Sequence, residues 1–177
     1  MQQPVLRTGR LVLRALTPAD EAAIFQLRTD SRVNTYLDRP LQTSPEEAAA
    51  FIKKIIESTA SGNSFYWGIV MEKSNQLIGT ICIWNISEDR LKAEIGYELV
   101  PEEQGKGFMR EALKAVIDFA FKSARLQSLE AYTHRDNKAS SNLLIHHGFI
   151  LQPGRKDPEN DNHIIFCLKA GITTAND

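Results

Sequence analysis

Apolar residues recur along the chain at two spacings, and the spacing separates helices from strands. Spacings of three and four residues indicate amphipathic helices, and short alternating or continuous apolar runs between turn residues indicate strands. The pattern predicts helices from Thr17-Pro18 to about Thr29, from Ser44-Pro45 to Ser61, over 108–122 and over 138–147. It predicts strands over 10–14, 65–71, 77–84, 93–100, 126–133, 149–151 and 163–169, a connector over 31–43, a polar loop over 153–162 and a fraying tail over 171–177.

The order of these elements predicts one α/β domain. A strand, two helices and a meander of strands are followed by alternating helices and strands, which is typical of a mixed sheet covered by helices. The chain of 177 residues is long enough for one ordinary domain and short for two. We therefore expect a single domain over 1–177.

Composition narrows the classes of function. Hydrophobic residues make up 42% and charged residues 24%, which argues against disorder and coiled coil. Lys and Arg number 21 and Asp and Glu 22, so the net charge of −1 argues against direct nucleic-acid or anionic-membrane partners. The N-terminus lacks a signal-peptide pattern, no apolar run approaches the ~20 residues of a membrane helix, and Cys82 and Cys167 cannot make a disulfide framework. These features predict a reduced, cytoplasmic protein.

A short loop between a predicted strand and a predicted helix carries the most informative chemistry. Gly105 and Gly107 leave their N–H groups open to close approach, and the following helix start adds unpaired N–H donors. Such a loop suits a phosphate or pyrophosphate, and Lys106 and Arg110 add positive charge. Glu111 supplies an acid at the same helix start, so a solvated glycine turn stays open as the alternative.

Two well-known phosphate loops do not fit this segment. The P-loop requires Gly-x-x-x-x-Gly-Lys-Ser/Thr, which is absent, and the dinucleotide fingerprint requires a third glycine where Arg110 stands. A nucleotide triphosphatase and a nicotinamide dehydrogenase are therefore disfavoured.

Four segments, in order, resemble one known family. Thr8-Gly-Arg-Leu-Val-Leu-Arg14 is similar to its first strand, Gln104-Gly-Lys-Gly-Phe-Met109 to its acetyl-CoA loop (Gln/Arg-x-x-Gly-x-Gly/Ala), and Asn137-Lys-Ala-Ser140 with Gly148-Phe149 to its later motif. The chain thus resembles the Gcn5-related N-acetyltransferase (GNAT) superfamily, and within it the RimJ/RimL branch, which includes acetyltransferases of ribosomal-protein N-termini. The resemblance spans nearly the whole chain. It implies an α/β fold with a mixed, mostly antiparallel central sheet flanked by about four helices.

The resemblance also implies acetyl-CoA as co-substrate and a site for it. The pyrophosphate is expected on the glycine loop, and the pantetheine along the strand end, where it would exchange backbone bonds with Leu99 and Val100. Asn137 is expected to contact the pantetheine side or to cap its helix, and Ser140 to reach the thiol. The loop residues expected at the cofactor are Gln104, Gly105, Lys106, Gly107, Phe108, Met109 and Arg110.

Acetyl transfer to an amine requires a group that takes a proton from the amine. Glu94 and Glu98 alternate on one face of the predicted strand, with Gly96 between them. Glu94 occupies a position resembling the family's frequent strand glutamate and is placed first as general base, and Glu98, nearer the loop, second. Either carboxylate could instead face water or pair with an arginine.

Two residues depart from the family pattern. Met109 replaces the last small residue of the loop motif, and Leu144 stands where many relatives carry a tyrosine proposed to protonate the leaving thiolate. Ser140 and Tyr97 are then the candidate proton donors, although Tyr97 is expected to pack in the core. The histidines and cysteines show no metal-ligand spacing, so no metal is expected.

The resemblance implies a protein N-terminal α-amino group as acceptor. A small amine such as a polyamine, an amino acid or an antibiotic is one alternative, and a catalytically silent acyl-CoA-binding sensor is another. The acceptor pocket is expected from residues 30–43 and 152–162, where the acids of 157–161 suit a cationic acceptor. Family analogy also suggests a homodimer.

Overall fold

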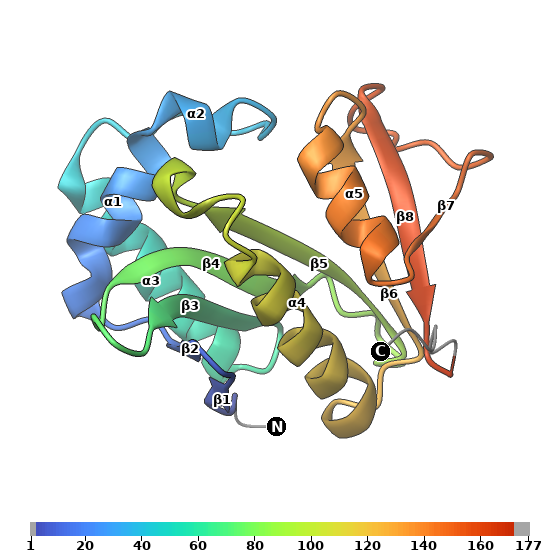
Figure 1. Ribbon diagram of the computed structural model, residues 1–177, viewed down its shortest axis with the longest axis horizontal. Helices are drawn as coiled ribbons and strands as arrows, with labels where there is room; N and C mark the ends of the chain where they lie inside the picture. The colour runs from blue at the N-terminus through green and yellow to red at the C-terminus, as the bar shows by residue number, and fades with distance from the viewer. Residues whose placement is uncertain (1–2, 172–177) are drawn as a thin grey trace.

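The computed structural model describes residues 3–171 and contains one eight-stranded sheet with helices on both faces (Figure 1). The strand order across the sheet is β1-β2-β3-β4-β5-β6-β8-β7. The strands are β1 Leu6–Arg7, β2 Leu11–Ala15, β3 Phe65–Met71, β4 Leu77–Trp84, β5 Lys92–Leu99, β6 Ser128–His134, β7 Ile150–Leu151 and β8 His163–Lys169. The helices are α1 Glu21–Thr29, α2 Ser31–Asn34, α3 Pro45–Ala60, α4 Phe108–Asp118 and α5 Lys138–His146.

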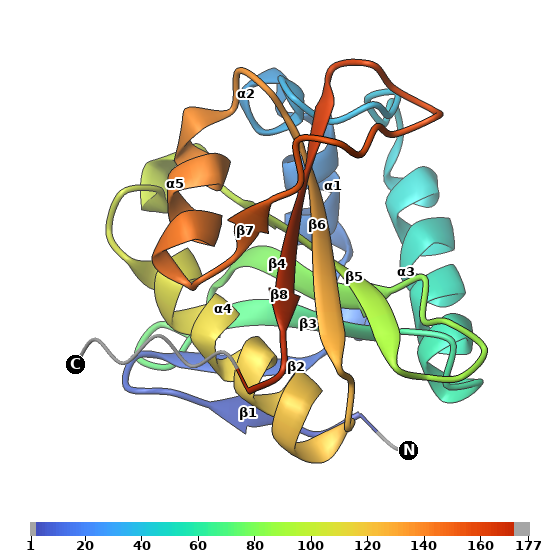
Figure 2. The same ribbon diagram turned by 90° about the vertical axis from the view of Figure 1, so that its right-hand side faces the viewer.

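The sheet divides into two arms, one of strands β1 to β5 and one of strands β6, β8 and β7, which meet where β5 pairs with β6. Strands β1 to β5 pair antiparallel in chain order, and β6 pairs antiparallel with β8. Only β5 and β6 are parallel, and they pair through three residues each, Lys92–Glu94 against Ser128–Glu130. Figure 2 shows β5 and β6 running apart from this junction. The predicted mixed, mostly antiparallel sheet is therefore confirmed, and it opens where β5 approaches its carboxyl end.

Each face of the sheet has its own hydrophobic core. One core lies under α4 and α5 and includes the odd-numbered β5 residues Ala93, Ile95 and Leu99. The other joins α1 and α3 to residues such as Val70 and Leu77 of the sheet. Because side chains alternate along a strand, the even-numbered β5 residues point to the α1 and α3 face. The structure thus puts Glu94, Gly96 and Glu98 on one face, as the sequence predicts.

Short elements account for the differences from the predicted pattern. β1 has two residues and α2 four, which is too short to show a period. α2 interrupts the predicted connector, and the Asp30 carboxylate caps it by accepting from the Arg32 N–H at 2.8 Å. The predicted helix over 108–122 ends in a π-helical turn, Phe119–Ser123.

The predicted frayed tail beyond Gly171 lies outside the described residues. Within residues 3–171, every helix is too short or too polar to cross a membrane.

An ion pair fixes the corner between β2 and α1. Asp20 is 6% exposed, and its carboxylate accepts from both terminal nitrogens of Arg14 at 2.8 Å and from the Thr17 N–H at 2.8 Å. Burial raises the pKa of Asp20, but the bonds from Arg14 and Thr17 outweigh it, so the pKa lies below its usual value. The corner sets the direction of α1 and therefore the place where α2 and the following segment lie.

Asp20→Asn is expected to lower the free energy of unfolding by about 3 kcal/mol, because it leaves the Arg14 charge without its partner in a partly buried site. Since the native pKa of Asp20 is depressed, this contribution is present above pH ~4 and is lost as the pH falls through the native pKa. Urea unfolding of both proteins at neutral and acidic pH measures it. The matched control, Glu72→Gln, breaks the exposed Arg7–Glu72 pair and should cost less than about 1 kcal/mol. An Asp20→Asn effect as small as the control's would refute the assignment.

Candidate functional site

A cavity of about 540 Å³ occupies the opening between β5 and the β6–α5 arm. Its wall combines β5, the loop that follows β5, the start of α4, the α5 helix and the segment around α2. Glu94, Val100 and Lys106, which the sequence also singles out, lie outside this wall. The predicted residues that the wall brings together are Glu98, Leu99, Gln104, Gly105, Gly107, Phe108, Met109, Arg110, Asn137 and Ser140.

The carboxyl end of β5 presents a free backbone edge to the cavity. The Val100 N–H donates to the Ile78 oxygen at 2.8 Å, so this amide has its partner in β4. Because hydrogen bonds alternate along an antiparallel pair, the backbone groups of Leu99 and Tyr97 point the other way, toward the opening. The Leu99 oxygen accepts from Gln104 Nε2 at 3.0 Å. Of the two residues predicted to exchange bonds with a pantetheine, the structure leaves the N–H of Leu99 available and that of Val100 occupied.

The loop after β5 forms a run of unpaired amides. Within the described part of the chain, the N–H groups of residues 105–110 donate to no protein acceptor. Gly105 and Gly107 have φ of +73° and +82°, the left-handed region that glycine adopts without strain. Gly107 is the residue that starts α4, so the positive end of that helix adds to the field at these amides. The arrangement suits an anion with several oxygens.

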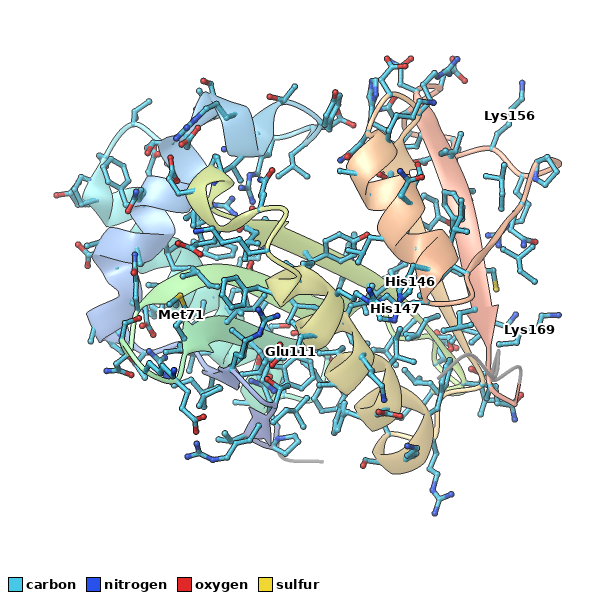
Figure 3. All side chains as sticks on the ribbon, in the orientation of Figure 1. Met71, Glu111, His146, His147, Lys156 and Lys169 are labelled. Atoms are coloured by element: carbon cyan, nitrogen blue, oxygen red, sulfur yellow. The ribbon has the colours of Figure 1, made fainter. Side chains whose placement is uncertain are left out.

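The N-terminal segment holds this loop in place. Glu111 of α4 accepts from the Arg10 N–H at 2.8 Å, from Arg10 Nε at 2.7 Å and from Thr8 Oγ1 at 2.5 Å (Glu111 is labelled in Figure 3). Arg10 in turn donates to the Lys106 oxygen at 3.1 Å, and its guanidinium carbon lies 4.4 Å from the Phe108 ring centroid. Burial raises the pKa of Glu111, but the bonds from Thr8 and Arg10 hold it below its usual value. The acid that sequence alone counts against an anion site is thus occupied in anchoring the loop.

Two basic residues of the loop have different roles. Lys106 Nζ donates to Glu103 Oε2 at 3.0 Å on the exposed side of the loop, and its side chain is not part of the cavity wall. Arg110 lies in the wall and, among the described residues, has no ion-pair partner. The cationic group that the loop offers to a ligand is therefore Arg110.

The start of α5 brings two hydroxyl groups to the cavity. Asn137 Oδ1 accepts from the Ser140 N–H at 3.1 Å, so the predicted helix cap is confirmed. Ser140 Oγ lies 2.9 Å from the Tyr97 hydroxyl, and both side chains line the cavity. The prediction that Tyr97 packs in the core is confirmed for its ring, and its hydroxyl extends past the apolar layer to Ser140, where a candidate proton donor is expected. Burial raises the pKa of Tyr97 to about 12.

Leu144 replaces the expected tyrosine and is fully buried. It is not in the cavity wall, whereas its neighbour Leu143 is. The hydroxyls of Tyr97 and Ser140 are therefore groups on this side of the cavity that can carry a proton in place of a tyrosine at position 144.

The two candidate glutamates have different surroundings. Glu98, with a side chain 7% exposed, accepts from Arg39 Nη2 at 2.5 Å and from Thr80 Oγ1 at 3.2 Å. Glu94 lies four residues earlier, about 13 Å away along the strand, and accepts from Asn85 Nδ2 at 2.6 Å. Glu98 thus has an ion-pair partner, the arginine that the sequence leaves open, whereas the partner of Glu94 is the neutral amide of Asn85.

Burial raises the pKa of Glu94, and the nearby negative charges of Glu130, Asp157 and Glu159 add to that effect, against the Asn85 bond. Between the glutamates, a Cβ on Gly96 would have Cys82 Sγ at 3.6 Å as its nearest neighbour. Gly96 therefore leaves room on this face for a small group between the two carboxylates.

The structure adds site residues that the sequence analysis does not name. Tyr36 and Leu37 line the cavity from the segment after α2, and His146, labelled in Figure 3, lines it from α5. Of the two predicted acceptor segments, 30–43 contributes to the wall and 152–162 does not. Their location depends on tertiary packing, and no local motif marks them. No cluster of three potential metal ligands occurs among residues 3–171.

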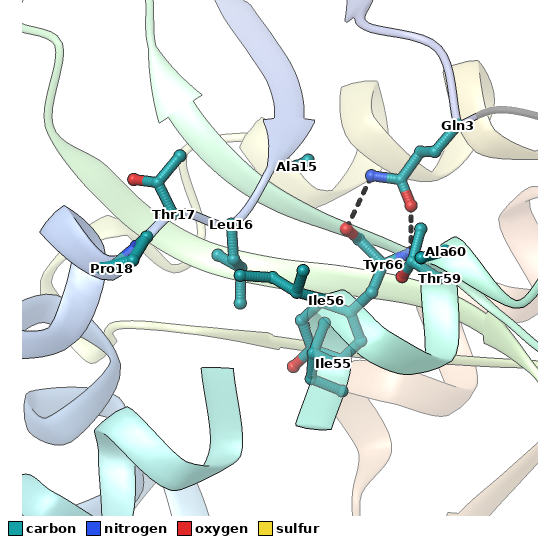
Figure 4. Close-up of a pocket in the computed structure, with 10 residues that line it drawn as sticks. All are labelled: Gln3, Ala15, Leu16, Thr17, Pro18, Ile55, Ile56, Thr59, Ala60 and Tyr66. Carbon is teal, nitrogen blue, oxygen red and sulfur yellow. Dashed lines mark hydrogen bonds between the residues drawn. The ribbon is translucent and has the colours of Figure 1, made fainter. Parts of the chain in front are cut away.

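A second cavity, of about 600 Å³, lies between α3 and the sheet on the face opposite α4 (Figure 4). Its walls are mainly apolar, and Gln3 closes one side by bonding the Tyr66 backbone at 2.8 and 2.6 Å. It contains none of the acid, base or loop residues discussed above. The predicted site residues that line a cavity are therefore found at the opening between β5 and β6 and not in this second cavity.

Comparison with known proteins identifies relatives over most of the chain. The family model "Acetyltransferase (GNAT) domain" matches residues 10–150. The "Uncharacterized N-acetyltransferase YoaA" of Bacillus subtilis is 34% identical over 146 residues, which cover 82% of each chain. The "[Ribosomal protein uS5]-alanine N-acetyltransferase" of Escherichia coli is 26% identical over 86% of this chain and 81% of its own. The "Spermidine N(1)-acetyltransferase" of Vibrio cholerae is 26% identical over 80% of each chain.

A solved structure shares the fold. "RimL- Ribosomal L7/L12 alpha-N-protein acetyltransferase in complex with Coenzyme A" superposes with a TM-score of 0.80 at 21% identity, covering 94% of this chain and 98% of its own. The overall architecture of the present chain is therefore that of a fold in which coenzyme A has been observed.

Gly107→Ala is expected to weaken coenzyme A binding about tenfold, a loss of about 1.4 kcal/mol. An alanine at φ +82° is strained, and its Cβ would meet Arg10 Nη2 at 3.4 Å, so the peptide groups of the loop have to turn. Isothermal titration calorimetry measures the dissociation constant. Gly62→Ala is the matched control, because Gly62 has φ +74°, open surroundings and no place in the cavity. Equal affinities for the two variants would contradict an anion site at these amides.

Proposed function

For this chain, which belongs to the GNAT family and is an acetyl-CoA-dependent N-acetyltransferase, we propose two things. The first is the role of each residue in the site, and the second is the class of amine that accepts the acetyl group. The pyrophosphate of acetyl-CoA binds the amides of residues 105–110 and Arg110, and the pantetheine pairs with the free edge at Leu99. Asn137 and Ser140 close the other side of the channel. The observation that carries this proposal is the continuous cavity from the unpaired amides to the Tyr97–Ser140 and Glu98 side chains.

The acceptor nitrogen approaches from the α1 and α3 face, over Gly96. There it lies between two carboxylates, and Glu94, whose raised pKa brings it nearer to that of an amine, takes the proton directly or through a water molecule. Bound acetyl-CoA supplies the acetyl group: the amine nitrogen bonds to the thioester carbonyl carbon and the C–S bond breaks. The leaving sulfur takes a proton from Ser140 and departs as the coenzyme A thiol. Tyr97 donates to Ser140 in its place and regains its proton from solvent, while Glu94 releases the amine proton to solvent. Glu98 holds the positive charge of the acceptor before its proton is lost.

The acceptor class that we propose is a protein N-terminal α-amino group. The relative that acts on ribosomal protein uS5 alanine supports it, together with the lining of the cavity by Tyr36 and Leu37, which belong to the segment expected to contact the acceptor. Spermidine is the second candidate, supported by the relative named as a spermidine N(1)-acetyltransferase and by the negative charges of Glu94 and the nearby Glu159.

An acceptor panel separates these candidates. Purified enzyme, acetyl-CoA, alanine- and serine-initiated peptides and spermidine are incubated together, and products are identified by mass spectrometry. We expect acetylation of a peptide α-amino group with the highest kcat/KM. Faster acetylation of spermidine would show that the acceptor class is polyamines and not protein N-termini. Binding of acetyl-CoA with no acetylated product would support the sensor alternative instead.

Glu94→Gln is expected to lower kcat about 100-fold while leaving the KM for acetyl-CoA unchanged, because it removes the base but not the cofactor site. The wild-type rate should rise with pH through the pKa of Glu94, which lies above its usual value, and the variant should lack that limb. Thiol release at a series of pH values measures both quantities. Glu98→Gln should raise the acceptor KM more than it lowers kcat. If Glu94→Gln, Glu98→Gln and the double variant all keep wild-type turnover across pH, neither carboxylate is the base.

A further inference from the structure

Glu98 already has a cation in the position that an acceptor amine would take. Both of its oxygens have partners, Arg39 Nη2 at 2.5 Å and Thr80 Oγ1 at 3.2 Å, and Thr80 accepts in turn from the Tyr66 hydroxyl at 3.0 Å. Thr80 belongs to β4 and is 2% exposed, so its bond is part of the rigid sheet. Arg39 is the partner of Glu98 that can be displaced, because it lies outside the helices and strands.

Arg39 belongs to a segment, Tyr36–Arg39, that bridges the two arms of the sheet. On the β5 side, Arg39 Nε donates to Asn34 Oδ1 at 2.7 Å. On the other side, the Tyr36 ring lies 5.3 Å from the His134 ring, and Asp38 Oδ2 lies 3.2 Å from His163 Nε2. Asn160 also donates to Asp38. Tyr36–Arg39 therefore spans the two arms beside the cavity, which Tyr36 and Leu37 line, and contacts side chains at both ends.

Two arginines, Arg39 and Arg28, already lie near the Glu98 carboxylate, and their positive charges disfavour a further cation there. Arg28 stacks on Phe51 with its guanidinium carbon 4.0 Å from the ring centroid, and its buried Nε has no partner among the described residues. Burial, followed by the positive charge of Arg39, lowers the pKa of Arg28. Two guanidinium groups thus share the field of one carboxylate, and a protonated amine at Glu98 would add a third cation. Such an acceptor gains the carboxylate only when Arg39 leaves it.

We propose that Arg39 is a specificity-determining residue that occupies Glu98 in the acceptor-free enzyme and is displaced by a cationic acceptor, together with the Tyr36–Arg39 segment. The inference rests on the proposed function, because it takes Glu98 as the anion that receives the acceptor. Arg39 thereby raises the dissociation constant of the acceptor, because the acceptor must displace it from Glu98. A neutral amine cannot exchange with it, whereas a protonated amine offsets the loss of the Arg39 ion pair with its own ion pair to Glu98.

Arg39→Met tests the exchange by removing the charge at nearly constant length. Its acceptor affinity is compared with that of the wild type and of Arg39→Lys, which keeps the charge. Arg7→Met is the control, since it breaks an exposed ion pair on β1, far from the cavity. The probes are spermidine and an alanine-initiated peptide, titrated by calorimetry into enzyme saturated with coenzyme A, so that no turnover is needed. Acceptor KM, acetyl-CoA KM and kcat are measured alongside.

We expect Arg39→Met to bind the cationic probes at least threefold more tightly and to show a lower acceptor KM with an unchanged acetyl-CoA KM. Arg39→Lys and Arg7→Met should match the wild type. Weaker or unchanged probe binding by a folded Arg39→Met protein would overturn the proposal. If the wild type binds the probes but acetylates no amine, the proposed function fails, while the binding comparison still decides the role of Arg39.

Asp38→Asn provides a second route if Arg39→Met does not fold. It weakens the contact of the Tyr36–Arg39 segment with His163 but keeps the Arg39 charge and the shape of residue 38. Because release of the segment then costs less, probe binding should tighten about twofold. Hydrogen–deuterium exchange of residues 35–43 should also rise when spermidine is added. Unchanged binding and unchanged exchange in this variant would overturn the proposal.

Discussion

The parting of β5 from β6 is the constraint on which the rest of the site depends. Parallel strands need a long crossover, and here it is α4 with the π-helical turn that follows it. The crossover brings β6 back to β5 for only three residue pairs. Past that point no hydrogen bonds join β5 to β6, and a buried backbone N–H or C=O group without a partner lowers the stability of the fold. The opening is therefore stable only as a channel for water or for a ligand that can replace the missing strand.

Charged contacts between distant parts of the chain shape this opening. Arg10 and Thr8, before β2, hold Glu111 and through it the loop that starts α4. Arg39, in the segment after α2, holds Glu98 on β5. In both cases the N-terminal third of the chain fixes the geometry of a residue that follows β4. The binding surfaces are thus set by directional ion pairs, whereas the two cores set the positions of the helices and strands.

The sequence is sufficient for the features that depend on local pattern. The long helices and strands follow from apolar spacing, and the glycine loop follows from Gly105 and Gly107, because glycine adopts the observed positive φ without strain. It is insufficient where a contact joins distant residues. That Lys106 turns to Glu103, that Tyr97 reaches Ser140 and that Arg39 pairs with Glu98 are results of how strands and loops pack. Periodicity assigns Tyr97 to the apolar face, which is correct for its ring, but it does not predict which group the hydroxyl meets.

The narrow junction between the arms also links cofactor supply to the lifetime of the folded protein. A molecule that binds the native state alone stabilises it by RT ln(1 + [L]/Kd), about 2.7 kcal/mol when its concentration is 100 times Kd. Acetyl-CoA in the channel would add contacts between β5 and α5 to the three β5–β6 residue pairs and the Tyr97–Ser140 contact that join the arms there. Starvation for coenzyme A would then leave the enzyme both without an acyl donor and more open to proteolysis, so abundance and activity would fall together.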